Sequence, residues 1–186
     1  MWGVDPTEEM LDRARATAGA RVGFKRARAE RLPFKDAWFE RAVMRLVVHL
    51  VDRPRALPEL ARVLVPGGRA AIATFVPEHF GHFWLTAFFP DVAEIDRSRF
   101  PAPATLATEL ESAGFSSVRT RTLTQRLRLT REDALERIRG RYISTLRLLG
   151  DAAFAAGLAR AEAELPEEVE SDLEWAVLSA ATPGAQ

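Results

Sequence analysis

The sequence contains no cysteine, which excludes disulfide bonds and thiolate metal sites. No apolar run approaches the roughly 20 residues that a membrane-spanning helix needs. Asp5, Glu8 and Glu9 lie too near the start for a signal peptide. Neither charge sign is in excess, because 26 basic residues stand against 26 acidic ones, so a basic field for nucleic acid is not indicated. These absences predict a soluble, cytoplasmic protein without nucleic acid or membrane partners.

What is present is ordinary for a globular protein. Hydrophobic residues make up 47% and charged residues 28% of the 186 positions. This length suits one domain with a sizeable core. We therefore expect a single domain over residues 1–186, with no second globular unit.

The first half of the chain predicts alternating strands and helices. A short strand ending in Asp5 precedes a helix that Thr7 can cap, with two acids in its first turn. Pro58 indicates that a later helix begins late or kinks. The other expected elements are an extended segment at 22–26, a buried strand at 39–48, a helix from Asp52 ended by the Pro-Gly-Gly run at 66–68, and a strand at 69–75.

The composition of the chain changes after residue 75. Residues 76–103 are rich in aromatic side chains and prolines, which is typical of a loop and short helix that cover another surface. The further expected elements are a helix at 104–113 ended by Gly114, a half-exposed antiparallel strand at 119–129, a helix from Thr130 to Leu149, a helix at 151–165 and a strand at 174–182.

Several short runs occur in a fixed order along the chain. They are Gly3-Val4-Asp5-Pro6-Thr7, Ala29-Glu30-Arg31-Leu32-Pro33-Phe34, Val48-His49-Leu50, Ala61 through Arg69, and Glu111-Ser112-Ala113-Gly114-Phe115. Together they resemble the class I S-adenosylmethionine-dependent methyltransferases of the small-molecule type. The resemblance implies an α/β fold, a Rossmann-like three-layer sandwich whose sheet is mostly parallel with an antiparallel C-terminal strand.

The family's first strand and its glycine-rich loop have no counterpart in this sequence. Only four residues precede Asp5, which would end the second strand. We therefore expect an N-terminally truncated methyltransferase domain with the first strand missing. Segments 76–103 and 131–165 are expected as cap elements on the substrate side.

The resemblance implies S-adenosylmethionine as cofactor and suggests how its nucleoside is held. Asp5 would accept hydrogen bonds from the ribose hydroxyls, and Pro6 and Met10 would pack against adenine. A plainer alternative is that Asp5 only favours the positive end of the following helix.

The segment before Leu32-Pro33-Phe34 is the expected adenine-binding loop, and it departs from the family pattern. Arg28 holds the position of an acid, and a guanidinium can stack on a ring but cannot accept a hydrogen bond. Ala29 would offer its backbone amide, and Glu30 could act as a displaced acceptor. Arg45 is also assigned to the cofactor side, although an arginine inside a strand needs a partner or an exit to solvent.

Four residues are candidate proton acceptors: His49, His79, His82 and Tyr142. His49 follows the expected strand at 39–48, and ligands of open α/β sheets bind at such strand ends. A structural histidine is an equal alternative there. His79 and His82 could line a substrate pocket or belong to a core-filling cap, and no convincing third ligand supports a metal site.

The leading functional hypothesis is methyl transfer from S-adenosylmethionine to a small-molecule acceptor. The alternative is a non-catalytic binding or assembly module that keeps the fold without cofactor binding. A nicotinamide dehydrogenase also places an acid after its second strand, but it leaves Leu32-Pro33-Phe34 and the run from Val63 to Gly68 unexplained. The alternating charges of 131–147 indicate a solvated helix face and not a nucleic-acid surface.

Overall fold

The computed structural model describes residues 1–184, which divide into two compact units. The first unit contains residues 1–72, 104–120 and the described residues from 178 onward. The second contains residues 73–103 and 121–177. Segments 76–103 and 131–165, which we expected as cap elements, both fall in the second unit, and the assignment of one domain to the whole chain stays a prediction.

The N-terminal part of the first unit is a small parallel β-α-β element. Strand β1 (Trp2–Asp5) pairs in parallel with β2 (Gly23–Arg26), and helix α1 (Glu8–Thr17) connects them. A Cβ at Gly3 would lie 2.8 Å from the ring of Phe24, so a larger residue there would force this ring to shift. The expectation that Thr7 caps α1 with its side chain is wrong, since its hydroxyl donates to Asp5 at 2.7 Å instead.

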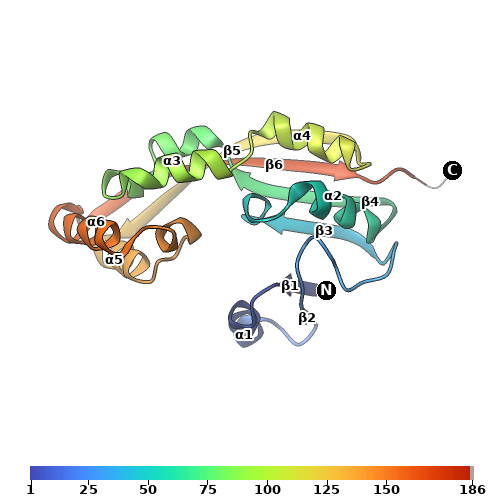
Figure 1. Cartoon of the computed structure of the whole chain (residues 1–186), viewed down its shortest axis with the longest axis horizontal. Helices are drawn as coiled ribbons and strands as arrows, with labels where there is room; N and C mark the ends of the chain where they lie inside the picture. The colour runs from blue at the N-terminus through green and yellow to red at the C-terminus, as the bar shows by residue number, and fades with distance from the viewer. Residues whose placement is uncertain (185–186) are drawn as a thin grey trace. The chain divides into compact units, whose positions relative to one another are not determined.

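A second sheet has four strands in the order β3-β4-β6-β5 (Figure 1). They are β3 (Phe39–Arg45), β4 (Leu64–Phe75), β5 (Ser116–Thr130) and β6 (Glu168–Ala181). Within residues 1–184 no strand pairs with both β1 and β3, so the two sheets are separate.

Hydrogen bonds establish that β6 runs antiparallel to β4. The amide of Thr182 donates to Gly68, and the amide of Val76 donates to Glu174. Eight residues forward along β4 thus correspond to eight residues back along β6. Strands β3 and β4 point the same way in Figure 1, so the C-terminal strand is antiparallel in the sheet, as expected.

Two strand boundaries differ from the expectation. The Pro-Gly-Gly run at 66–68 lies inside β4, because Gly67 and Gly68 are bonded to the segment after β6; helix α2 (Arg53–Arg62) ends before it. Pro58 lies within α2 without delaying its start. The last strand begins at Glu168 and not at Glu174.

The expectation of a buried strand at 39–48 is wrong for most of β3. Only Met44 is buried along it, and Val43 is 73% exposed. The cause is position, because β3 is an edge strand of the four-stranded sheet. Helix α4 (Pro103–Ser112) lies in the first unit from Ala104 onward, and it ends as expected before Gly114, whose φ of 92° favours glycine.

The second unit is largely helical and has its own hydrophobic core. Its helical segments are η2 (Pro77–Gly81), η3 (Trp84–Ala87), α3 (Pro90–Arg99), α5 (Arg131–Arg139), η4 (Ser144–Arg147) and α6 (Asp151–Glu164). Aromatic residues of 83–89 pack with aliphatic residues of α5 and α6. The single helix expected from Thr130 to Leu149 is wrong, since Gly140 ends α5 and Arg141 takes a φ of 46°.

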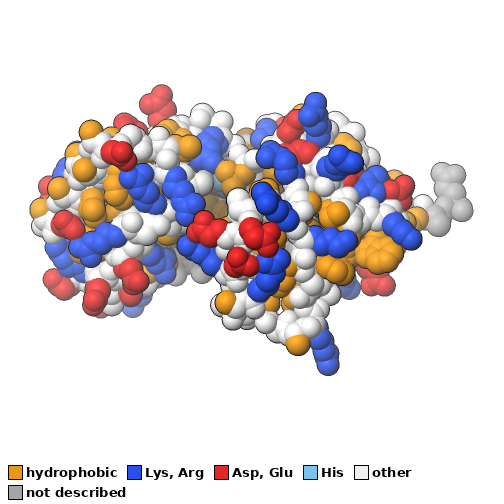
Figure 2. All heavy atoms as spheres, turned by 60° about the horizontal axis from the view of Figure 1, so that its bottom comes forward, with side chains coloured by type: hydrophobic (Ala, Val, Ile, Leu, Met, Phe, Trp, Pro, Cys, Tyr) orange, Lys and Arg blue, Asp and Glu red, His pale blue; other side chains and the backbone are white. Residues whose placement is uncertain are grey.

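None of the helices in residues 1–184 is long and apolar enough to cross a bilayer. Nor do the described residues hold a group of three or more His, Asp or Glu side chains placed to bind a metal ion. Acidic and basic side chains are intermixed on the face in Figure 2.

Candidate functional site

Asp5 stands at the carboxyl end of β1, where its carboxylate is held by the next turn of chain. Its Oδ1 accepts hydrogen bonds from the amide of Thr7 at 2.8 Å and from the Thr7 hydroxyl at 2.7 Å. Its Oδ2 has no hydrogen-bond partner among residues 1–184. One oxygen therefore orients the side chain, and the other remains available as an acceptor.

The ends of β1 and β2 are tied together beside Asp5. The amide of Ala27 donates to the Asp5 carbonyl at 3.2 Å, and Arg26 Nε donates to the Pro6 carbonyl at 3.0 Å. Pro6 and Met10 are exposed, Met10 by 46%. The carboxyl ends of two parallel strands thus present one carboxylate and two apolar side chains, which is the place where open α/β sheets bind ligands.

The loop after β2 is anchored by Glu30. Its Oε1 accepts the amide hydrogen of Asp52 at 2.8 Å, and Arg28 Nε lies 3.4 Å from its Oε2. The Asp52 amide is the main cause that lowers the pKa of Glu30, and the Arg28 charge adds to it. Glu30 therefore joins this loop to the start of α2, while Arg28 stays largely exposed.

Arg62 and Glu59 of α2 also anchor the loop at 32–36, and the sequence analysis assigned no role to either residue. Arg62 donates to the carbonyls of Leu32 and Phe34 and to the carboxylates of Glu59 and Asp36. Glu59 also accepts from the amide of Leu32 at 2.7 Å. Their three-residue spacing on one helix signals a possible pair, but nothing local shows that the partner loop is 32–36.

The turn after β3 carries His49 and an uncommon backbone conformation. Leu46, the residue directly after the strand, has a φ of 50°, which costs a non-glycine residue of the order of 1 kcal/mol or more. His49 lies in the short helix η1 (Val48–Leu50) and is half-buried. Arg45, the last residue of β3, is exposed. His49 thus lies three residues beyond a strained position of the backbone.

His79 and His82 lie in the second unit and differ sharply in environment. His79 is fully buried among Phe75, Phe80 and Phe83, and burial with the nearby His82 lowers its pKa to about 4. His82 is exposed, with Nε2 3.4 Å from Oε2 of Glu174. His79 is therefore neutral near pH 7, and His82 is the accessible histidine of the two.

Tyr142, also in the second unit, follows the turn that ends α5. The residue is 38% exposed, and the guanidinium carbon of Arg137 lies 5.9 Å from the centre of its ring. Desolvation raises the pKa of its hydroxyl above the ordinary value, which makes a phenolate costly near neutral pH.

The expected site residues thus divide between the units. The first unit holds all the residues assigned to the cofactor, namely Asp5, Pro6, Met10, Arg28, Ala29, Glu30 and Arg45, and it also holds His49. The second unit holds His79, His82 and Tyr142. The roles assigned to these residues stay predictions.

Residues 1–72, which contain this first group, match the family described as a methyltransferase domain. A demethylmenaquinone methyltransferase of Thermus thermophilus is 34% identical over 141 residues, which are 61% of this chain and 62% of that protein. The chain therefore spans less than two thirds of the length of this relative.

Solved structures extend the likeness to nearly the whole chain. A protein of Anabaena variabilis, described as a methyltransferase of an antibiotic biosynthesis pathway, superimposes with a TM-score of 0.71 at 18% identity, over 95% of this chain and 80% of that one. The chain has the class I methyltransferase fold. A phosphoethanolamine N-methyltransferase of Haemonchus contortus, solved with S-adenosylhomocysteine, superimposes with a TM-score of 0.57 at 18% identity. The match covers 98% of this chain and 43% of that one. The resemblance inferred from the sequence is confirmed.

Proposed function

We propose that this methyltransferase-fold protein binds S-adenosylmethionine through its first unit and transfers the methyl group to a small-molecule acceptor. The observation that carries the proposal is Asp5, in the segment that matches the methyltransferase family. Its carboxylate is oriented by Thr7 and keeps one oxygen available at the end of a parallel strand.

The residues of this region suit the nucleoside part of the cofactor. A ribose diol needs an acceptor, which Oδ2 of Asp5 supplies. The adenine ring needs an apolar surface, and Pro6 and Met10 are exposed beside the strand end. Glu30 serves mainly to hold the loop, because the Asp52 amide and Arg28 occupy its oxygens.

When bound, S-adenosylmethionine supplies an electrophilic methyl group on a sulfonium. The protein's part is to orient the acceptor, to exclude water, and to take a proton where the acceptor carries one. His49 follows the carboxyl end of β3, which makes it the first candidate for such a proton acceptor in this unit. His79 is a poor candidate, because its lowered pKa of about 4 makes it a weak base.

Calorimetric titration of the chain with S-adenosylmethionine and S-adenosylhomocysteine tests the cofactor site. We expect micromolar affinity, lowered at least tenfold by Asp5→Asn, which removes the charged acceptor but keeps the shape. Asp12→Asn is the matched control, because Asp12 is an exposed acid of α1 that pairs only with Arg15 among the described residues. An Asp5→Asn variant that binds as well as the parent chain would rule out the ribose role, and no binding by the parent would overturn cofactor binding by this chain.

Methyl transfer itself is measured separately, with S-adenosylmethionine labelled in its methyl group and a panel of small hydroxyl, amine and carbon acceptors. We expect label to reach at least one acceptor and His49→Gln to lower the rate without weakening cofactor binding. Cofactor binding with no transfer to any acceptor would favour the non-catalytic module.

A further inference from the structure

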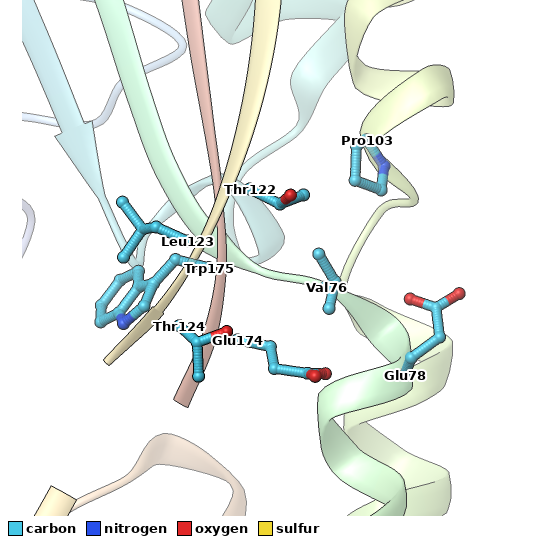
Figure 3. A pocket seen from close by; sticks show the side chains of 8 residues that line it. All are labelled: Val76, Glu78, Pro103, Thr122, Leu123, Thr124, Glu174 and Trp175. Carbon is cyan, nitrogen blue, oxygen red and sulfur yellow. The ribbon is translucent and has the colours of Figure 1, made fainter. Parts of the chain in front are cut away.

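The second unit contains a hollow of about 530 Å³ that none of the roles above uses. Figure 3 shows side chains that line it from three parts of the unit. The first part is the strands, with Thr122 and Thr124 from β5 and Glu174 from β6. The second is the segment after β4, with Val76 directly before η2 and Glu78 within it, and the third is Pro103, the first residue of α4. This volume is in the ordinary range for small-molecule sites, roughly 300 to 1,000 Å³.

Strand alternation explains which side chains meet there. Thr122 and Thr124 lie two residues apart, so both project from the same face of β5. In Figure 3 they and Glu174 extend toward Val76, while Leu123 and Trp175 project from the other side of the strands. Trp175 packs its ring against Phe75 at 4.4 Å. The hollow is therefore built by regular strand geometry and backed by an aromatic core.

The polar lining is acidic and contains no cation. Two carboxylates, Glu78 and Glu174, and two threonine hydroxyls supply the polar groups, and no Lys or Arg is among the lining residues. Val76 and Pro103 add an apolar wall. The two carboxylates come from η2 and β6, so residues far apart in the sequence both line the hollow.

Two basic side chains, His82 and Arg97, lie beside these carboxylates and are not among the lining residues of the hollow. His82 Nε2 lies 3.4 Å from Oε2 of Glu174, on the η2 side. Arg97 lines an adjoining hollow with Glu78 and Pro77, and its Nη2 comes within 2.9 Å of where a Cβ on Gly81 would lie.

We propose that this hollow is a binding site for a small organic cation, a protonated amine that carries a short apolar group. The ammonium group would be attracted by both carboxylates and donate hydrogen bonds to them and to the threonine hydroxyls, and the apolar part would cover Val76 and Pro103. Glu174 is partly buried, so its carboxylate attracts a cation more strongly than a carboxylate in open water does, because solvent screening is reduced there.

The test uses 2-phenylethylammonium as the probe, with 2-phenylethanol as its neutral analogue, both titrated into the whole chain and followed by NMR or calorimetry. We expect saturable binding of the amine at least tenfold tighter than of the alcohol. No cofactor is added, so the result does not depend on methyl transfer. Equal affinity for the two probes, or no saturable binding of the amine, would overturn the proposal.

Variants locate the site. Glu78→Gln and Glu174→Gln should each weaken amine binding at least fivefold and leave the alcohol unchanged. Glu168→Gln is the matched control, because Glu168 is an exposed acid of β6 that does not line the hollow. An equal loss in Glu168→Gln would show that only the general surface charge matters. Circular dichroism checks folding, and since Glu78 is exposed, Glu78→Gln decides the outcome if Glu174→Gln unfolds.

Discussion

The backbone amide of Glu174 donates a hydrogen bond to Nδ1 of His79 across 3.5 Å, which links β6 to η2. Because Nδ1 accepts, the proton of the neutral imidazole lies on Nε2. That Nε2 is buried and has no hydrogen-bond partner among the described residues. His79 is thus a buried neutral histidine whose protonation the fold opposes.

This burial makes the stability of the protein depend on pH. The folded pKa of His79 is about 4 against 6.5 for the unfolded chain. The unfolded state therefore binds more protons than the folded state between these two pH values. The contribution of neutral His79 to stability is complete above pH 6.5 and is lost as the pH falls toward 4. We expect the free energy of unfolding to fall by about 3 kcal/mol from this residue over that range.

Urea unfolding at a series of pH values measures the effect. In His79→Gln most of this slope should disappear, whereas His82→Gln should keep most of it because burial is the larger cause. An unchanged slope in His79→Gln would show that other groups cause the acid sensitivity.

Arg62 should matter for the stability of the loop at 32–36. Arg62→Ala removes donors to two carbonyls and leaves Glu59 without its main partner. We expect a loss of about 2 kcal/mol in the free energy of unfolding, the size typical of charge-assisted hydrogen bonds. Arg62→Lys should recover only part of it, because lysine lacks the planar fork of donors. Hydrogen exchange of residues 32–36 should become faster in Arg62→Ala, and unchanged exchange would contradict the anchoring role.

Ala37 is a site where glycine should stabilise the protein. It is exposed and has a φ of 50°, a conformation that glycine adopts without steric cost. We expect Ala37→Gly to raise the free energy of unfolding by about 0.5 to 1 kcal/mol. Ala156→Gly, at an exposed position inside α6, should lower it by a similar amount. Both variants replace alanine by glycine. If urea unfolding showed that both raise, or both lower, the free energy of unfolding, the backbone argument would be refuted.

A larger residue at Gly157 should destabilise the protein, although this glycine lies within a helix. A Cβ there would come within 2.3 Å of the Phe89 ring. We expect Gly157→Ala to destabilise the protein by about 1 to 3 kcal/mol despite the better helix propensity of alanine. Adding Phe89→Leu should relieve the clash, so the double variant should lose less than the sum of the two single losses. Additive losses in thermal melts would exclude this contact as the cause.

The local elements of the chain were mostly predictable. The helix before Gly114, the helix from Asp151 and the strand ending at Asp5 all follow from periodicity and end signals. The helix from Thr130 did begin at the expected place, with its hydroxyl accepting from the amide of Asp133, but its end was misplaced. The apolar spacing of a helix continues past Gly140 as far as Leu149, so the sequence pattern hides the helix end that Gly140 marks.

The errors concern relations between distant segments. Strand β3 has the composition of a buried strand, yet Val43 is exposed because burial depends on which neighbours the strand acquires. The Pro-Gly-Gly run looks like a helix terminator, but it extends β4 because the segment after β6 supplies hydrogen bonds. Neither outcome is visible in the residues themselves.

The amino-acid sequence by itself determined the family resemblance, the order of strands and helices, and the placement of Asp5 before a helix, because these depend on neighbours along the chain. Only the tertiary structure decided that Arg62 holds the loop at 32–36, that His79 is buried and neutral, and that Glu78 and Glu174 line one hollow. Each of these depends on which segments far apart in sequence come into contact, and burial, charge and hydrogen bonding follow from that contact.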